Sequence, residues 1–405
     1  MRRVLPQGAG LTLAITMTLT MAAATAQGPV KAAPDQQRQT ALALEQEGRN
    51  PEAEAAWRAV LKTHPSSPEP YAHLGLLEAR QEHYTEAVPL YRKALALGPQ
   101  IPGVRFNLGL ALFKGGEPKK AIQEFSLLLK NAPPSSPEAQ HLTILIGMAH
   151  YGLAEYAEAV PYLKEAAAHD AQNSPLLLSL AHSCLWSKQY QCVLDTYHQI
   201  LMLNADSAEA DMLAGEALDE LKDNAGATEQ FRAAVKADPK LPNVHFGLAY
   251  LLWTQKRYPE AASEFKAELA NDPDHIQSML YLADTNMQLN QMEDARPLLE
   301  KVVRLAPSYA LAHLDLGILY AEDGRKDDAL RELTAAEKLN PSDVSVHWRL
   351  GRLYRAMGKK DEAKAEFDKA STLNKAADED LYKKIANGRA RPAQAQEPAA
   401  APADK

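Results

Sequence analysis

Side chains that could do chemistry are scattered along this chain rather than gathered into motifs. The twelve histidines are spread over the whole sequence, which contains no GxGxxG or GxxxxGK[ST] phosphate-binding loop, no HExxH zinc motif and no CxxC pair. Catalysis needs a nucleophile with its base, paired carboxylates, a metal cluster or a bound phosphate. We therefore expect no catalytic residue, no cofactor and no metal, and a protein that is not an enzyme.

The two cysteines, Cys184 and Cys192, are the one pair whose spacing suggests a reaction. If they lie on opposite arms of a helical hairpin that turns near Ser187, they face each other and could form a disulfide in an oxidising compartment. The alternative is a pair of small buried thiols at ordinary packing positions. His182 is close in sequence, but a zinc site needs three or four ligands.

A hairpin of this kind is predicted by a 34-residue repeat, of which residues 310–341 are the clearest copy. Apolar residues recur three and four apart in 311–321 and again in 329–339, with a turn between them. Position 8 is always small, as at Gly317, position 20 is alanine or valine, as at Ala329, and position 24 is bulky, as at Leu333. Proline often ends the copy, as at Pro341. The register holds through ten copies.

This pattern resembles the tetratricopeptide repeat family. The ten copies span residues 34–67, 68–101, 102–135, 140–173, 174–207, 208–241, 242–275, 276–309, 310–343 and 344–375. The resemblance implies an all-α fold, a right-handed superhelical solenoid of antiparallel helix hairpins. It also implies that the first helix of each repeat lines a concave groove where partners bind.

Positions 5, 9 and 12 of each leading helix share one face and are the candidate groove positions. They carry Phe106, Leu110 and Phe113 in the third copy and Phe246, Tyr250 and Trp253 in the seventh, with Met148, Tyr151 and Asp284 in the fourth and eighth. Apolar side chains on a concave surface predict capture of a peptide segment. They could equally pack against the adjoining repeat.

Charge is uneven along these leading helices. The sixth is acidic and includes Glu216 and Asp219, which could steer a basic segment towards the aromatic residues of the seventh or form an ordinary solvated face. The tenth holds Trp348, Arg352 and Arg355 and no acid, and could receive a carboxylate. The family's carboxylate clamp has lysine and asparagine where Trp348 and Arg352 stand, so that activity is not expected.

Both ends differ from the repeats. Met1, Arg2 and Arg3, an apolar run over 11–21 and the small residues before Gln27 predict a secretory signal peptide over 1–26, followed by a linker over 27–33. The apolar run is too short to span a membrane. Residues 376–388 are predicted to form a capping helix, and the Ala/Pro/Gln-rich residues 389–405 a disordered tail.

Composition limits the partners. The net charge of −8 argues against nucleic acid. We predict a non-enzymatic scaffold of the cell envelope, periplasmic or secreted, that binds protein or peptide segments in its groove. Two alternatives are a module whose aromatic residues stack on a glycan or small ligand, and a structural protein that associates with itself.

Overall fold

The computed structural model describes residues 35–204 and 206–389. All regular elements in these ranges are α-helices, which confirms the predicted all-α repeat fold. The predicted signal peptide and linker, and residues 390–405 of the predicted tail, lie outside the described residues. No helix within the described ranges combines the length and apolar character that crossing a bilayer requires.

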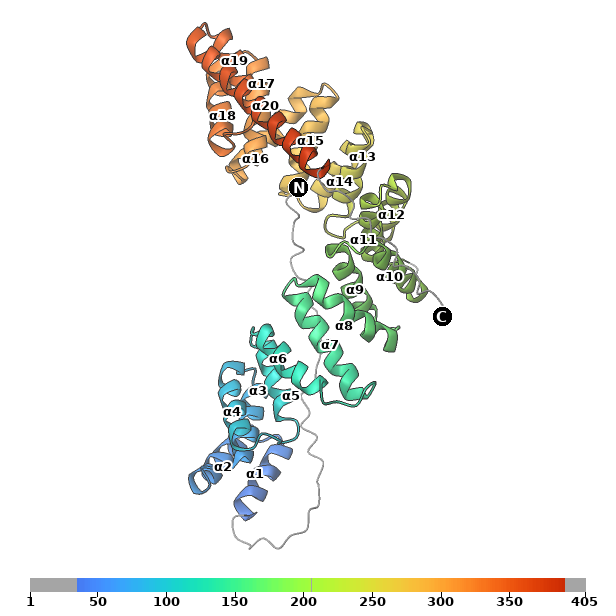
Figure 1. Ribbon diagram of the computed structural model, residues 1–405, viewed down its shortest axis with the longest axis vertical. Helices are drawn as coiled ribbons and strands as arrows, with labels where there is room; N and C mark the ends of the chain where they lie inside the picture. Colours follow the sequence, from blue (N-terminus) through green and yellow to red (C-terminus); the bar gives the residue numbers. More distant parts are fainter. Residues whose placement is uncertain (1–34, 205, 390–405) are drawn as a thin grey trace, which may run out of the picture. The chain divides into compact units, whose positions relative to one another are not determined.

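The helices form consecutive hairpins (Figure 1) that divide into two compact units, residues 1–237 and 238–405. In the first unit the helices are α1 (Asp35–Gln46), α2 (Asn50–Thr63), α3 (Pro68–Arg80), α4 (Tyr84–Leu97), α5 (Val104–Lys114), α6 (Pro118–Leu129), α7 (Pro137–Gly152), α8 (Tyr156–His169), α9 (Ser174–Trp186), α10 (Tyr190–Leu203), α11 (Ala208–Glu220) and α12 (Asn224–Ala237). Each odd-numbered helix packs against the even-numbered helix that follows it.

The second unit repeats this arrangement. Its helices are α13 (Val244–Thr254), α14 (Tyr258–Asn271), α15 (Ile276–Gln288), α16 (Met292–Leu305), α17 (Ala310–Glu322), α18 (Lys326–Leu339), α19 (Val344–Ala356) and α20 (Lys360–Arg389). Contacts also join α13 to α15 and α17 to α19, so within this unit the leading helices of neighbouring repeats lie side by side.

The small and bulky repeat positions meet inside each hairpin. A Cβ atom added to Gly75 would lie 2.9 Å from the ring of Tyr91, and one added to Gly351 would lie 2.7 Å from the ring of Phe367. Both distances are well below a van der Waals contact. The glycine therefore lets the two helices approach until the bulky side chain of the second fills the space over the first.

The turn inside every hairpin contains one residue with positive φ, fourteen residues after the first residue of its repeat. Glycine occupies this site in four repeats. Six repeats place another residue there, namely Glu82, Ala154, Lys188, Lys222, Lys256 and Asn290. The left-handed conformation is disfavoured for residues with a Cβ atom, so packing of the two helices imposes it.

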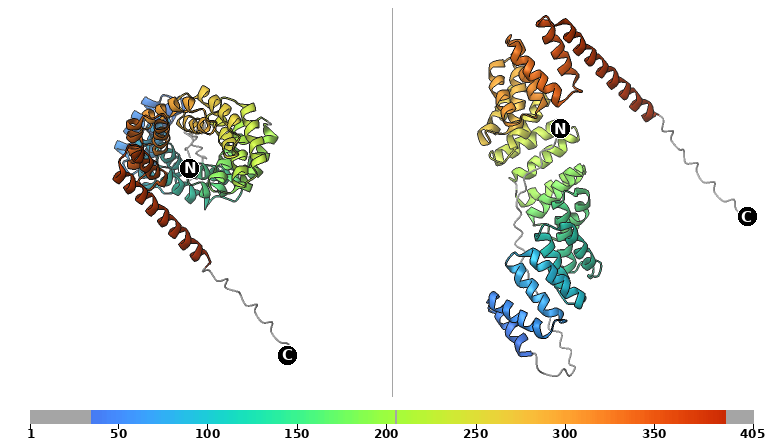
Figure 2. Two further views of the ribbon diagram at one scale, coloured as in Figure 1. Left: turned by 90° about the horizontal axis from the view of Figure 1, so that it is seen from above. Right: turned by 90° about the vertical axis from the view of Figure 1, so that its left-hand side faces the viewer.

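The C-terminal end differs from the prediction of a separate capping helix over 376–388. These residues continue α20, which runs as one helix from Lys360 to Arg389 (Figure 2, dark red). The reason is local. The tenth repeat has Lys375 where other repeats have a terminating proline, and no glycine or proline stands between Lys360 and Asn387 to interrupt the helix.

Candidate functional site

Four aromatic side chains form a partly exposed cluster in the second unit, which we call the aromatic cluster. Phe246, Tyr250 and Trp253 project from α13, and Tyr281 joins them from α15. The centroid of the Tyr281 ring lies 5.3 Å from that of Tyr250 and 5.1 Å from that of Trp253, and both pairs meet edge to face. These are favourable aromatic geometries. The three predicted groove residues of α13 thus lie together, and Tyr281 was missed.

A buried carboxylate fixes the start of α13. Glu268 on α14 accepts hydrogen bonds from the backbone N–H groups of Asn243, at 2.9 Å, and Phe246, at 3.2 Å. The first N–H groups of a helix lack partners within it, and a negative charge there is favoured by the helix dipole. Because Glu268 interrupts the usual apolar pattern of the second helix, sequence suggests looser packing, but the side chain is 2% exposed and anchors the helix that carries the aromatic cluster.

Two carboxylates lie beside the aromatic cluster, and we call them the acid pair. The indole Nε1–H of Trp253 donates a 2.6 Å hydrogen bond to Oδ2 of Asp284 on α15. Asp315 on α17 is close enough to interact electrostatically with Asp284 and with Arg349 on α19. Burial raises the pKa of Asp315, Asp284 adds to the rise and Arg349 opposes it, giving about 7. Asp284 was predicted as a groove residue, whereas Asp315 was not.

The basic end of this unit is on α19. Trp348 is 45% exposed, and the guanidinium carbons of Arg352 and Arg349 lie 4.8 Å and 5.6 Å from its ring centroid. These are cation–π distances. The exposed Arg355 instead lies over the ring of Phe367 on α20, at 5.7 Å, so its side chain packs within the last hairpin.

The equivalent prediction for the first unit is wrong for Leu110. Its side chain is completely buried in the core that joins α5 to α7, so it packs between repeats and cannot touch a partner. Phe106 is partly buried, with its ring 6.0 Å from that of Phe125 and 5.4 Å from that of His141. Phe113 and Met148 are also partly buried and pack on core residues.

Aromatic residues missed from sequence join Tyr151 in the first unit. The Tyr151 ring meets those of Tyr156 and His182 edge to face, and Tyr156 stacks on Trp186 with centroids 6.0 Å apart. Tyr156 and Trp186 were missed because they follow or end the leading helices, outside the three positions considered. Nε2 of His182 bonds to Glu209 on α11 at 2.9 Å.

The acidic helix α11 uses several of its carboxylates inside the first unit. Asp211 is buried and accepts a 3.0 Å hydrogen bond from the Tyr197 hydroxyl. Asp219 is partly buried, and burial raises the pKa of its carboxyl. Glu216 is exposed. The two predicted residues thus differ in exposure, since Glu216 is exposed and Asp219 is partly buried.

Cys184 on α9 and Cys192 on α10 form a disulfide in the structure, with Cα atoms 5.8 Å apart. That separation is within the usual range for a disulfide. The bond links the two arms of one hairpin across its turn, at the place that the repeat spacing indicates.

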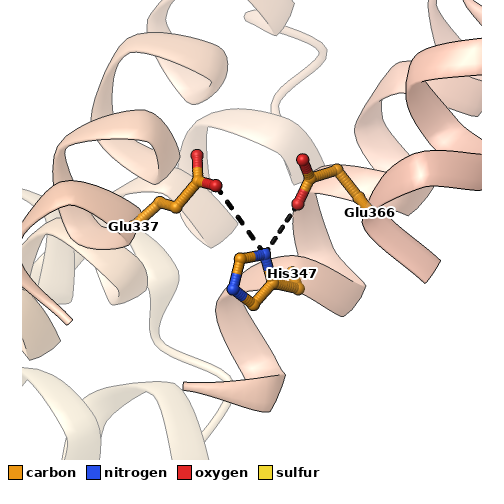
Figure 3. Close-up of side chains that lie close together, drawn as sticks. All are labelled: Glu337, His347 and Glu366. Atoms are coloured by element: carbon orange, nitrogen blue, oxygen red, sulfur yellow. Dashed lines mark hydrogen bonds and ion pairs between the residues drawn. The ribbon is translucent and has the colours of Figure 1, made fainter. Parts of the chain in front are cut away.

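Three potential metal ligands meet at the C-terminal end (Figure 3). Nδ1 of His347 lies 2.7 Å from Glu366 Oε2 and 3.8 Å from Glu337 Oε1, and the three side chains come from α18, α19 and α20. Nζ of Lys369 lies 2.9 Å from Glu337 and 2.8 Å from Glu366. A lysine therefore already supplies positive charge to both carboxylates, and we interpret the group as an ion network that closes the last hairpin.

The same histidine position is used in other repeats. His245 pairs with Glu264 at 2.6 Å and His313 with Glu332 at 2.7 Å, each joining the two helices of one hairpin. A histidine at position 4 therefore joins the two helices of its hairpin in these repeats.

The stacked hairpins and the partly exposed side chains on their leading helices define an all-α helical-repeat protein. A tetratricopeptide repeat family model matches residues 38–102, 74–136, 194–242, 212–276, 246–310, 280–343 and 314–379, which together are well over half of the chain. The chain belongs to the tetratricopeptide repeat family. Proteins of this family generally act as non-catalytic scaffolds for protein–protein interaction.

Solved structures share the fold. The C-terminal part of a repeat-containing protein from Cytophaga hutchinsonii aligns with a TM-score of 0.50 and 17% identity over 60% of this chain and 99% of its own. YrrB, described as having an unusual peptide-binding site, aligns with a TM-score of 0.41 and 20% identity over 47% of this chain and 97% of its own. MamA from Desulfovibrio magneticus RS-1 gives 0.40 and 21% over 42% and 96%. No curated protein sequence shows significant similarity to the chain.

Proposed function

We propose that this protein is a non-enzymatic scaffold of the cell envelope that holds segments of partner proteins on the leading helices of its second unit. The observation that supports this most strongly is the aromatic cluster. Four large aromatic side chains on adjacent helices remain partly exposed, although each could gain stability by complete burial.

Such a cluster has the composition of a binding hot spot. Tyrosine and tryptophan dominate the energetics of protein interfaces because they bring a large apolar area with few rotatable bonds. The carboxylate of Glu268 fixes the helix that carries three of the rings, so little order has to be gained when a partner binds. The cluster therefore suits a short partner segment with an apolar or aromatic anchor.

Residues 1–26 support an envelope location, since they have the basic, apolar and small-residue zones of a secretory signal. The disulfide between Cys184 and Cys192 fits the same proposal, because oxidising compartments are where such bonds persist. Fractionation of cells that express the full chain, with detection of the mature amino terminus, tests this part. Recovery of uncleaved protein in the cytosol would contradict it.

A glycan ligand is the second candidate, and one geometric observation favours it. The rings of Tyr250 and Trp253 are inclined by only 25°, with centroids 5.9 Å apart, and such a surface could stack on sugar rings. Self-association is the third candidate and does not require the aromatic cluster.

The test is affinity capture from the native exported fraction, with the mature chain from Gln27 as bait. A Tyr250→Ala, Trp253→Ala variant should lose at least tenfold in partner binding, because truncation of two hot-spot residues costs about 2 kcal/mol or more. The matched control is Leu305→Ala, Leu339→Ala, which removes exposed apolar side chains from α16 and α18. Circular dichroism should show that both variants keep their helices.

The outcomes separate the candidates. Capture of a protein by the native bait and by the control, but not by the aromatic variant, supports the scaffold. Release of the bound material by glycan rather than by peptide would favour the second candidate. Equal capture by all three baits would contradict a role for the aromatic cluster.

A further inference from the structure

Asp315 is placed where a carboxylate is costly. It lies on α17 and is partly buried, and its carboxylate makes no hydrogen bond or ion pair with any other described residue. Asp284, from the neighbouring helix α15, adds a second negative charge. Like charges held close together disfavour the ionised form of one of them. The acid pair is thus an electrostatic cost to the folded chain that its own groups only partly offset.

The groups that face Asp315 account for this imbalance. α15 contributes Asp284 and α19 contributes Arg349, the one cation that acts on Asp315 among the described residues. On α16 and α18, Glu300 accepts a hydrogen bond from the Tyr320 hydroxyl and Glu332 pairs with His313. One arginine therefore faces two carboxylates.

The aromatic cluster is attached to this acidic site. The Trp253 indole donates a hydrogen bond to Asp284, and Tyr281 stands three residues before Asp284 on the same helix. The aromatic cluster and Asp284 are therefore neighbours. A cation is attracted both to carboxylates and to the faces of tryptophan and tyrosine rings. A neutral group would be attracted to the rings but not to the carboxylates, and an anionic group would be attracted to neither.

Building on the proposed scaffold function, we propose that the acid pair and the aromatic cluster together bind a lysine or arginine side chain of the partner segment. The long aliphatic stem of that side chain lies along the rings, and its charged end reaches Asp284 and Asp315. Below its pKa of about 7, Asp315 holds a proton when the site is empty. The incoming cation takes the place of that proton, which is released to solvent.

Proton release gives this proposal a measurable signature. Asp315, with a pKa of about 7, is mostly protonated at pH 6 and mostly ionised at pH 8. If the cation binds only the ionised form, affinity rises by up to about tenfold between these two pH values. His275, which meets the Phe246 ring edge to face, is a histidine at the cluster, and burial lowers its pKa from 6.5.

The experiment selects a probe and then titrates it. A displayed library of random dodecapeptides without histidine is panned on the mature chain, with counter-selection on the Tyr250→Ala, Trp253→Ala variant. The affinity of the best peptide is then measured at pH 6 and pH 8, both for the native chain and for Asp315→Asn. The same measurements are made with a copy of the peptide in which glutamine replaces each lysine and arginine.

The expected result is enrichment of lysine or arginine in the selected peptides, loss of at least tenfold in affinity for the glutamine copy, and tighter binding at pH 8 than at pH 6. Asp315→Asn should bind more weakly than the native chain at pH 8, and its affinity should no longer depend on pH. The variant still contains His275, so any pH dependence that His275 causes would remain.

Each contrary outcome has a distinct meaning. Selected peptides that need Tyr250 and Trp253 but contain no basic residue would overturn the cation proposal and leave the scaffold intact. A pH dependence retained by Asp315→Asn would overturn the assignment to Asp315. Failure of every peptide to depend on the aromatic cluster would overturn both this inference and the groove-binding function of the second unit.

Discussion

The helices α5 and α13 are both leading helices of their repeats, but they differ in how deeply the side chain at position 9 is buried. Position 9 is Leu110 in α5, where it is completely buried between repeats, and Tyr250 in α13, where it stays partly exposed. The neighbouring leading helix decides the difference. Leu110 belongs to a core that includes large aliphatic residues of α7, whereas Tyr281 of α15 meets Tyr250 edge to face. Repeat position alone therefore does not identify a binding surface.

One hairpin of each unit is closed by a different chemistry. In the first unit a disulfide links α9 to α10, and in the second unit charged networks such as His347 with Glu366 link α19 to α20. A covalent bond responds to redox conditions, and a charged network responds to pH. These two hairpins should therefore lose stability under different treatments.

The largest expected effect is on packing. Leu110→Ala should destabilise the first unit by about 3 kcal/mol, because it removes a fully buried side chain and leaves a cavity. Chemical denaturation monitored by circular dichroism, combined with hydrogen exchange of α5–α7 peptides, measures it. Binding through the aromatic cluster should not change. A loss of partner binding with native stability would show that Leu110 contacts the partner after all.

A smaller effect is expected from reduction. Opening the bond between Cys184 and Cys192 should cost the first unit about 2 kcal/mol, the entropy associated with so short a loop. Hydrogen exchange measured with and without dithiothreitol should show that reduction speeds exchange in α9 and α10 and leaves the exchange rates in α13–α19 unchanged. Cys184→Ala, Cys192→Ala is the control, since reduction should not affect it. Two reactive thiols in denatured, unreduced protein would refute the bond.

The smallest expected effect is a pH dependence of the last hairpin, α19 and α20. Burial alone would lower the pKa of His347, but hydrogen bonds to the Pro341 carbonyl and to Glu366 carry it above 6.5, while Lys369 and His347 hold the pKa of Glu366 below 4.5. Stabilisation by the pair is therefore fully present between about pH 4.5 and 6.5.

This stabilisation should fade, by about 1 kcal/mol, as pH rises through the folded pKa of His347 or falls through that of Glu366. Thermal unfolding followed by hydrogen exchange of α19 and α20 at several pH values measures it. His347→Gln should flatten the change on the alkaline side. An unchanged profile in that variant would mean that another group is responsible.

Sequence was sufficient for the fold because its signal is repeated ten times. A glycine at position 8 and a bulky residue at position 24 describe one contact, as between Gly351 and Phe367, and each copy reinforces the others. The candidate site was only partly predictable. Phe246, Tyr250 and Trp253 stand on one helix face, so spacing found them.

The missed residues depend on contacts between repeats. Tyr281 and Asp315 both stand at position 6, beside the three positions taken to line the groove, and their importance appears only when neighbouring leading helices are packed together. From sequence, a carboxylate at the usually apolar position of Glu268 suggests looser packing. The structure shows instead that this carboxylate accepts hydrogen bonds from the backbone N–H groups of Asn243 and Phe246, which the sequence alone does not reveal.

The left-handed turns allow this molecule to be tuned by engineering. Where Ala154, Lys188 or Lys256 holds a positive φ, glycine would relieve a conformation that disfavours a Cβ atom, with a gain of about 0.5–1 kcal/mol per turn. Six repeats offer such a turn, and in none does it coincide with the aromatic cluster or the acid pair. Stability could therefore be graded repeat by repeat, giving a scaffold of adjustable stability whose binding face keeps its native side chains.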